Sequence, residues 1–310
     1  MWKYILKRLG MMVFVVLGVA IIIFSIMYFV PGNPAQIILG TSATPEQIEE
    51  LEAQLGLNDP FMVQLGNFLL NALKGDFGSS YITRNPVLSE FMERFPRTLT
   101  LAALSILVSV IIGLPLGIIA ATHQGKWQDY IAIVISMLGL SIPGFWLALM
   151  MVREFSVVHD WLPAYGIGTW KHFVMPVIST ALISLAQIAR HARTDLLDVI
   201  RSDYVTTAKA KGVNSHDVIY KHALPNALIP LVTMIGSSFG AAMGGTVITE
   251  SVFMMPGVGQ YMTKAITNLD YPAVRGSVVI LAIIFSFIML VVDLIYAYID
   301  PRIKAQYAGK

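Results

Sequence analysis

Cysteine is absent from the 310 residues of this chain, and charged residues are scarce. Without cysteine the chain has no disulfides, thiolate metal ligands or cysteine nucleophiles. Aspartate, glutamate, lysine and arginine make up only 13% of the residues, whereas ordinary soluble domains carry about 25%. Hydrophobic residues make up 56%. This composition favours a polytopic membrane protein, and the net charge of +2 gives no indication of nucleic-acid binding.

Two motifs that would give the chain its own chemistry are also missing. No Gly-x4-Gly-Lys-Ser/Thr phosphate-binding loop occurs, because Gly125-Lys126 lacks both the preceding glycine and the following hydroxyl. The 6 histidines form neither a His-x3-His pair nor a His-Glu-x2-His zinc motif. We therefore expect no ATP hydrolysis by this chain alone, no catalytic residue, no cofactor and no metal site.

Apolar runs long enough to cross a membrane recur along the chain. A spanning helix needs about 20 mostly apolar residues. These runs predict an all-α protein with 6 transmembrane helices in a single membrane domain over residues 1–310. An even number of spans places both termini on one side of the membrane. The predicted spans are Leu9–Val30, Thr98–Ala121, Tyr130–Val152, Phe173–Ala189, Asn226–Thr249 and Ser277–Val292. The last is short and extends to Ile299 if Asp293 lies near the interface.

Basic residues concentrate in alternate connecting segments. With the N-terminus inside, the inner segments hold 13 of the 21 lysines and arginines, although the outer segments contain far more residues. Cytoplasmic loops carry an excess of basic residues, so we expect both termini in the cytoplasm. Residues 31–97 then form an extracytoplasmic insertion, and residues 190–225 form a cytoplasmic segment.

The insertion of residues 31–97 has the signals of folded helices. Thr44-Pro45-Glu46-Gln47 predicts a helix start with Thr44 as N-cap and Gln47 three residues later, the spacing of a capping box. A second helix is predicted from Phe61 to about Leu73. The insertion holds 8 acidic and 4 basic residues. Both a solvated acidic surface and a docking surface for a partner outside the membrane fit this charge.

Helix breakers and one acidic residue are candidates for the substrate path. Pro143-Gly144 interrupts the third predicted span, where it is compatible with close packing or with flexing. Glu250 lies at the outer end of the fifth, where a gate or cavity role and interfacial solvation are both open. Arg190 and Arg193 are interpreted as anchors at the inner interface. The candidate gate or cavity residues are Glu250, Pro143 and Gly144.

The inner segment of residues 190–225 predicts two helices joined at a glycine. Leu196, Leu197, Ile200 and Tyr204 fall at helical spacing, so the fourth span is expected to continue beyond the membrane. Gly212 interrupts this helix, with Lys209 and Lys211 in its last turn. Asn214 or Ser215 then caps a second helix, which carries Val218, Ile219 and Ala223 and stops at Leu224-Pro225. The exposed apolar residues expected on such an elbow suit insertion into a groove of a partner.

The same segment resembles the "EAA" loop of the membrane subunits of bacterial binding-protein-dependent ABC importers, written E-A-A-x3-G-x9-I-x-L-P. The glycine of the motif falls on Gly212, which puts Thr206-Thr207-Ala208 at its first three positions and His222 at the isoleucine. Leu224 and Pro225 match, while the acidic residue, the first alanine and the isoleucine are absent. The resemblance implies that Thr206, Thr207, Ala208, Lys211, Gly212, Leu224 and Pro225 couple this chain to an ATPase.

Further segments are similar to the dipeptide, oligopeptide and nickel branch of these permeases, and they cover nearly the whole chain. They include Leu55–Pro60, Gly75–Ser80, Thr207–Gly212, His222–Pro230 and Glu250–Gly259. The resemblance implies a type I importer in the cytoplasmic membrane of a bacterium or archaeon, which moves di- or oligopeptides by alternating access. The implied partners are a second homologous permease, two cytoplasmic ABC ATPases that bind ATP and Mg, and an extracytoplasmic substrate-binding protein. Coupling would run through residues 203–225.

Other functions stay open beside this one. A nickel or metallophore permease is the alternative within the family, although the chain has no histidine-rich path. An autonomous secondary transporter or channel would favour inverted repeats or intramembrane acids, which the sequence does not show. An intramembrane enzyme would need metal ligands or a nucleophile constellation, and neither is found.

Overall fold

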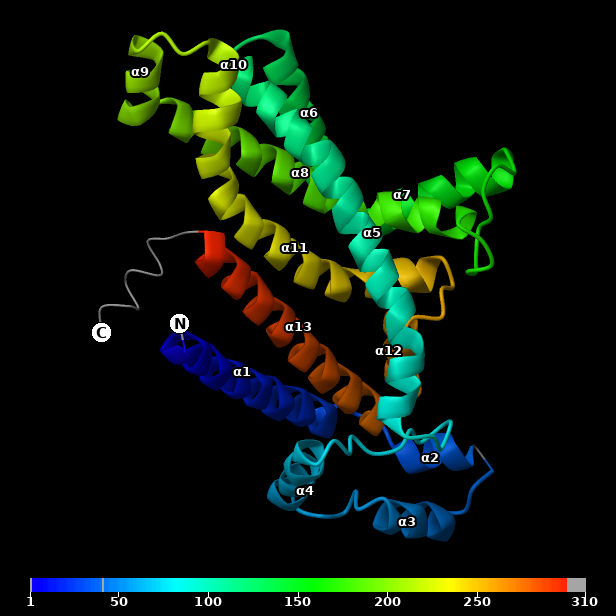
Figure 1. The fold of residues 1–310 in the computed structure, drawn as a ribbon. Helices are drawn as coiled ribbons and strands as arrows, with labels where there is room; N and C mark the ends of the chain where they lie inside the picture. The colour runs from blue at the N-terminus through cyan, green and yellow to red at the C-terminus, as the bar shows by residue number, and fades with distance from the viewer. Residues whose placement is uncertain (1, 41, 300–310) are drawn as a thin grey trace. The chain divides into compact units, whose positions relative to one another are not determined.

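The computed structural model describes residues 2–40 and 42–299, and this part of the chain is helical apart from its connections and a single β-bridge between Ser79 and Pro86 (Figure 1). The helices that run at membrane-spanning length are α1, α5, α8, α11 and α13. The remaining elements are short. In chain order they are α1 (Trp2–Phe29), α2 (Pro34–Leu39), α3 (Pro45–Gln54), α4 (Phe61–Leu73), α5 (Val87–Thr122), α6 (Trp127–Ser141), α7 (Gly144–Met151), the π-helix η1 (Val152–Val158), α8 (Lys171–Ile200), α9 (Asp203–Ala210), α10 (Ser215–Asp217), the π-helix η2 (Val218–Ala223), α11 (Leu224–Val252), α12 (Val258–Thr267) and α13 (Tyr271–Ile299).

The predicted all-α membrane architecture is confirmed. Five helical stretches are long and apolar enough to span a membrane, and the count rises to 6 when the bent pair α6 and α7 is taken as one span. The bend between these two helices is 94°. It follows from Pro143, which lacks a backbone donor and forces the residue before it out of the helical region. Ile142 accordingly has extended backbone angles, with φ of −81° and ψ of 119°. The third predicted span, Tyr130–Val152, is therefore not one straight helix.

The chain divides into two compact units. Unit 1 contains residues 98–255 and 288–299 of the described chain, and unit 2 contains Trp2–Arg97 and Pro256–Phe287. Long helices α5 and α13 each contribute one part to either unit.

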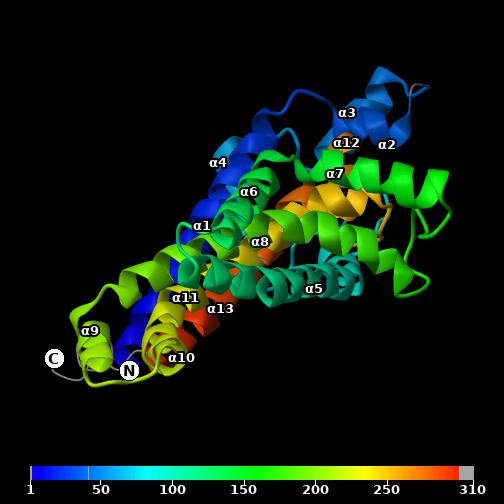
Figure 2. The same ribbon diagram turned by 90° about the horizontal axis from the view of Figure 1, so that it is seen from above.

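In unit 1, α8 is the central helix, and it packs against α6, α7 and α11 (Figure 2). Glycines let the neighbouring helices approach its backbone closely. A Cβ added at Gly113 or Gly117 of α5 would lie 2.7 Å or 2.5 Å from a backbone oxygen of α8, and one added at Gly139 of α6 would lie 2.9 Å from the Ala186 Cβ. Real Cβ atoms do not tolerate such distances, so side chains are excluded at these contacts. The Ser109 hydroxyl also donates to the Ala181 carbonyl oxygen at 2.9 Å.

In unit 2, the first helix packs against α4, and α2 packs against α3. The predicted capping box is confirmed: the Thr44 hydroxyl accepts from the Gln47 backbone N–H, and the Gln47 side chain accepts from the Thr44 backbone N–H. The predicted second helix of the insertion is confirmed as α4, Phe61–Leu73. A buried apolar cluster joins α12 and the start of α13 to the start of α5, with Phe91, Val258 and Val274 at its centre. The insertion of residues 31–97 is thus folded rather than a loose loop.

Candidate coupling and gating sites

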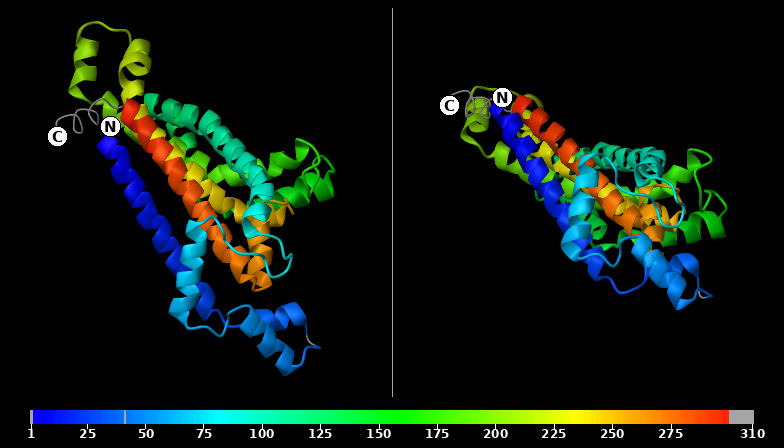
Figure 3. Two further views of the ribbon diagram at one scale, coloured as in Figure 1. Left: turned by 60° about the horizontal axis from the view of Figure 1, so that its bottom comes forward. Right: turned by 90° about the horizontal axis from the view of Figure 1, so that it is seen from below.

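The predicted helix–glycine–helix elbow is present and belongs to unit 1 (Figure 3). Helix α9 ends at Ala210, and Gly212 has a φ of +82°, a left-handed value that glycine adopts without a steric penalty. Of the two predicted caps, the structure selects Asn214, whose side-chain oxygen accepts from the Asp217 backbone N–H at 2.7 Å. We refer to α9, the Gly212 turn, α10 and η2 as the elbow.

The joint at the base of the elbow differs from the prediction. The fourth span does continue beyond its predicted end at Ala189, because α8 runs to Ile200. Tyr204 is not on that helix, since Ser202 begins the separate helix α9 with extended backbone angles. The second helix of the elbow does not stop at Leu224-Pro225 either. The π-helical turn η2 leads directly into α11, whose first turn contains Pro225, a position that needs no backbone donor.

Three aliphatic side chains of the elbow are buried, whereas the expected exposed apolar surface is supplied by Tyr204 and Tyr220, which are 45% and 46% exposed. Val205 of α9 and Val218 and Ala223 of η2 are each 1% exposed or less. They pack with Leu196, at the end of α8, in one apolar cluster. Burying an aliphatic side chain contributes about 1.5–3 kcal/mol, so this cluster attaches the elbow firmly to α8 and α11.

The exposed surface of the elbow combines polar residues with the rings of Tyr204 and Tyr220. The motif residues Thr206, Thr207 and Lys211 are exposed. The Thr206 and Thr207 hydroxyls donate to backbone carbonyls one turn earlier in the chain, at 3.3 Å and 2.9 Å. Gly212 is exposed as well, and a Cβ built there would meet nothing within 4 Å. A partner can therefore contact the turn without displacing any part of this chain.

The other motif residues lie at the base of the elbow. Ala208 is half-buried, and its carbonyl oxygen accepts from the Val213 N–H at 3.3 Å across the glycine turn. Leu224 is half-buried and Pro225 is exposed. The structure thus brings the predicted motif residues into one elbow, while their contact with an ATPase stays a prediction.

A polar contact that the sequence did not indicate links the two arms of the elbow. Asn226 in the first turn of α11 donates to the Tyr204 hydroxyl at 2.9 Å and to the His222 carbonyl oxygen at 3.1 Å. Residues 204 and 226 lie far apart in sequence, so only the turn at Gly212 brings them together. This contact holds α9 against the end of η2.

Glu250 is buried near the end of α11. Its side chain is 1% exposed, and its carboxylate accepts from the Thr98 hydroxyl of α5 at 2.6 Å. The reading of Glu250 as a solvated interfacial residue is therefore wrong. One residue earlier, the Thr249 hydroxyl accepts from the Thr180 hydroxyl of α8 at 3.0 Å. Polar contacts thus connect α5, α8 and α11 at one end of unit 1.

The breaker pair of the third span lies at the start of α7, which contacts both α8 and α11. Pro143 is exposed and Gly144 is half-buried. A Cβ at Gly144 would lie in ordinary contact, 3.7 Å from the Ser179 carbonyl oxygen of α8. Proline therefore creates the bend, and close packing does not require this glycine. A gate or cavity role for the pair stays a prediction.

A buried ion pair, which the sequence did not reveal, joins α6 to α8. Arg193 binds Asp129 with two parallel hydrogen bonds, Nε to Oδ1 at 2.6 Å and Nη2 to Oδ2 at 2.9 Å. Asp129 also accepts from the Gly125 N–H at 3.0 Å, and its side chain is 3% exposed. The predicted role of Arg193 as an interface anchor is therefore replaced by a bidentate ion pair within the protein. Arg190 is exposed.

Within residues 2–40 and 42–299, no group of three or more His, Asp or Glu side chains is placed to hold a metal ion.

Two family models together match nearly the entire sequence. Residues 113–305 match "Binding-protein-dependent transport system inner membrane component", and residues 1–102 match the N-terminal component of the same transport systems. The chain belongs to this permease family. It is a multi-pass inner-membrane subunit of an ABC importer and lacks an ATPase domain, so the transport system includes ATPase and binding-protein partners.

Curated relatives of this permease cover nearly its full length. It is 40% identical to the dipeptide transport system permease protein DppB of Alkalihalophilus pseudofirmus, with 98% of this chain and 100% of the relative covered. It is 38% identical to the glutathione transport system permease protein GsiC of Escherichia coli K12, with 98% and 99% covered. These relatives belong to the peptide and nickel branch that the sequence motifs indicate.

Solved structures show the same fold. The permease is similar to a chain of the MetNI methionine ABC transporter in an inward-facing conformation, with a TM-score of 0.56, 20% identity, and 69% of this chain and 97% of that chain covered. It is also similar to a chain of an amino acid ABC transporter crystallised with histidines, with a TM-score of 0.53, 16% identity, and 69% and 94% covered.

Replacing Asp129 by asparagine is expected to destabilise the permease by about 1.5–3 kcal/mol, because the partly buried Arg193 loses its charge-assisted hydrogen bonds. Thermal unfolding of the detergent-solubilised protein, followed by tryptophan fluorescence, measures the change. Asp198→Asn on the exposed face of α8 is the matched control and should melt like the unmodified protein. Asp129→Asn combined with Arg193→Gln should cost less than the two single changes added together. Equal melting of Asp129→Asn and Asp198→Asn would contradict a stabilising ion pair.

Proposed function

We propose that this permease moves short peptides across the cytoplasmic membrane and is driven by ATPases that bind its elbow. The elbow is the observation that carries the proposal: its turn at Gly212 is exposed, while Val205, Val218 and Ala223 are buried against α8 and α11. Support for a peptide substrate comes from the dipeptide and glutathione permeases that match the chain along nearly its full length.

In the proposed topology, residues 1–310 form one membrane domain with both termini in the cytoplasm. Residues 31–97 are the extracytoplasmic insertion, and residues 190–225 are the cytoplasmic coupling segment. The substrate path lies between this permease and a second homologous permease. Two ATPases that bind ATP and Mg act from the cytoplasmic side, and the binding protein delivers peptide from the other side. The excess of basic residues in the inner segments supports this orientation.

The proposed mechanism follows from how the elbow is attached. Closure of the ATPases on ATP moves the exposed face around Thr206, Thr207 and Lys211. Because η2 continues into α11 without a break, and the cluster around Val205 and Val218 fixes the elbow to α8, the elbow cannot move without these two helices. Displacement of α8 and α11 then changes access to the path between the permeases. The ATPases supply the free energy, and this chain supplies the mechanical connection.

Peptide uptake is the direct test of the substrate class. In proteoliposomes containing both permeases, the ATPases and the binding protein, we expect ATP-dependent uptake of radiolabelled alanyl-alanine that unlabelled dipeptides compete away. Nickel(II) and its chelates should not compete. Uptake of nickel without uptake of any peptide would assign the chain to the other substrate class of its branch.

Gly212→Val tests the elbow. A branched side chain in the left-handed region costs about 1–2 kcal/mol and also adds bulk on the exposed turn, so we expect loss of coupled uptake with normal membrane insertion. Gly125→Val is the matched control, because Gly125 also has an exposed turn, a φ of +77° and nothing within 4 Å of its Cβ. Co-purification of the ATPase with each variant, together with uptake, separates coupling from folding. Equal uptake by both variants would remove the elbow from the mechanism.

We also propose that the Glu250–Thr98 contact belongs to a gate that stays closed in the resting permease, with Pro143 and Gly144 providing the bend beside the path. Glu250 is a buried carboxylate in a helix of a membrane protein. Such residues are energetically costly and rare, and they usually mark functional positions. Its bond to Thr98 connects α11 to α5 within unit 1. Rearrangement of this contact is the expected step when access changes.

Thr98→Val tests this gate, because valine keeps the shape of threonine but cannot donate to the carboxylate. A hydrogen bond to a charged group contributes about 1.5–3 kcal/mol, so ATP hydrolysis without binding protein should rise roughly tenfold. Thr122→Val is the control: Thr122 lies on the same helix, and its hydroxyl donates to backbone carbonyls of that helix. Unchanged basal hydrolysis by Thr98→Val would exclude the contact as a gate.

A further inference from the structure

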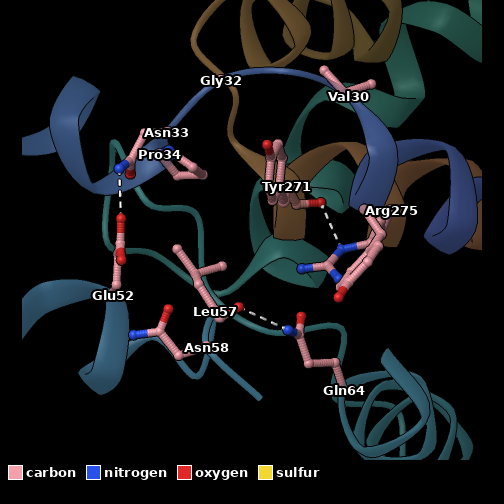
Figure 4. Close-up of a pocket in the computed structure, with 11 residues that line it drawn as sticks. Val30, Gly32, Asn33, Pro34, Glu52, Leu57, Asn58, Gln64, Tyr271 and Arg275 are labelled. Carbon is pink, nitrogen blue, oxygen red and sulfur yellow. Dashed lines mark hydrogen bonds between the residues drawn. The ribbon is translucent and has the colours of Figure 1, made fainter. Parts of the chain in front are cut away.

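A polar pocket of about 350 Å³ lies in unit 2, outside the elbow and the Glu250 contact (Figure 4). Its volume falls in the range of about 300–1,000 Å³ that small-ligand pockets have. The insertion of residues 31–97 contributes one side, and the start of α13 contributes the other. The lining includes Asn33, Glu52, Leu57, Asn58, Gln64 and Arg275.

Arg275 places an uncompensated positive charge at one side of this pocket. Its guanidinium lies over the ring of Phe24 with 4.8 Å to the ring centre, and its Nε donates to the Tyr271 carbonyl oxygen at 3.3 Å. Within the described part of the chain, no carboxylate lies within 4 Å of it. The Tyr81 hydroxyl is hydrogen-bonded to the guanidinium, but burial raises the pKa of Tyr81, so this phenol stays neutral and does not balance the charge. A guanidinium held in this way binds carboxylates in a bidentate geometry.

Glu52 places a negative charge on the opposite side. Figure 4 shows Glu52 and Arg275 on different sides of the pocket, with Leu57 between them. The Asn33 amide donates to one Glu52 oxygen at 2.5 Å, which orients the carboxylate. Glu52 has no lysine or arginine partner within 4 Å in the described part of the chain. Its charge can therefore be balanced by an ammonium group.

Two amide side chains lie between these charges. Gln64 gives its amide hydrogens to the Leu57 and Asp59 carbonyl oxygens, at 3.0 Å and 2.8 Å, so its side-chain oxygen remains as an acceptor. Asn58 is exposed and makes no hydrogen bond within residues 2–40 and 42–299. Amide side chains of this kind pair with the N–H and C=O groups of a peptide bond.

We propose that this pocket is a binding site for a short zwitterionic peptide, with the terminal carboxylate on Arg275, the terminal ammonium toward Glu52, and the peptide bond beside Asn58 and Gln64. A free dipeptide carries both charges at neutral pH, because its terminal carboxyl has a pKa of about 3.5 and its terminal amine one of about 8. The inference rests on the proposed peptide function, and it adds a site formed by this chain alone. A peptide released on this side would bind here before it enters the path between the permeases.

Binding of radiolabelled alanyl-alanine to the complete transporter, without its binding protein, tests the site. The transporter is placed in phosphatidylcholine nanodiscs, and two blocked ligands are compared: N-acetyl-alanyl-alanine, which lacks the ammonium, and alanyl-alanine amide, which lacks the carboxylate. Each blocked ligand should bind roughly tenfold more weakly or worse, the factor expected for the loss of one charge-assisted hydrogen bond.

Two charge variants identify the residues. Glu52→Gln should weaken binding of the free dipeptide about tenfold and leave binding of the N-acetyl ligand unchanged, because that ligand has no ammonium to lose. Arg275→Gln should likewise weaken binding of the free dipeptide about tenfold. It should leave binding of alanyl-alanine amide unchanged, because that ligand has no carboxylate to lose. Glu49→Gln, exposed on the same helix α3 and outside the pocket, is the matched control for Glu52. Arg153→Gln, also exposed, is the control for Arg275. If Arg275→Gln fails to fold, the blocked ligands and Glu52→Gln still decide.

Uptake with binding protein separates this inference from the proposed function. If the complete system takes up dipeptide, but the free dipeptide binds Glu52→Gln and the unmodified transporter equally, the pocket is not the site and the function stands. If neither uptake nor binding occurs, both are overturned. Nanodiscs containing phosphatidylethanolamine test the other zwitterion at this position. Displacement of the dipeptide by that lipid, dependent on Glu52, would assign the pocket to a lipid headgroup instead.

Discussion

The close backbone approach between α8 and its neighbours is the constraint on which unit 1 depends. At Gly113, Gly117 and Gly139 there is no room for a side chain, because α8 atoms lie within 3 Å of the Cβ positions. Lipid offers no hydrophobic driving force between spanning helices, so association relies on packing at small residues and on polar contacts. Both are present along α8. The helix is therefore fixed relative to α5 and α6, and any force applied at its end acts on the whole unit.

The polar contacts of α8 lie toward its two ends. Near one end Arg193 binds Asp129 of α6. Near the other, Thr180 contacts the α11 residue that precedes Glu250. The hydrogen bonds to the Asp129 and Glu250 carboxylates are 2.6 Å at their shortest, and neither carboxylate is exposed to solvent. Buried charges of this kind specify one arrangement of the helices, because any shift leaves a charge without its partner. A permease that alternates between two states must break or exchange such contacts, which makes them natural positions for control.

The sequence predicted the helices well and the tertiary contacts poorly. Hydropathy located every long span, since a run of about 20 apolar residues has few alternatives, and cap chemistry located the helix that begins at Pro45. The bend at Pro143 was visible as a breaker, but its 94° angle was not. Helical spacing showed Val218 and Ala223 as an apolar face without showing what covers it. Val205 and the end of α8 cover this face. They precede Gly212 in the chain, and the turn at Gly212 brings Val218 and Ala223 back against them.

The charged residues show the same limit more clearly. Arg193 near the end of a predicted span reads as an interface anchor, because local sequence does not reveal that the first turn of α6 presents Asp129 to it. Glu250 and Arg275 lie near predicted span ends, where water and burial are equally compatible with the pattern. Pairing decides between these readings, and it depends on residues more than 60 positions away for Arg193 and more than 150 for Glu250.

Arg275 differs from both, because it has no carboxylate partner within the described part of unit 2. Its neighbours there are aromatic rings and neutral hydroxyls, so the fold positions this charge without neutralising it. A guanidinium that the fold orients but does not pair is available to a ligand, whereas Arg193, already bound at 2.6 Å, is available only to the architecture.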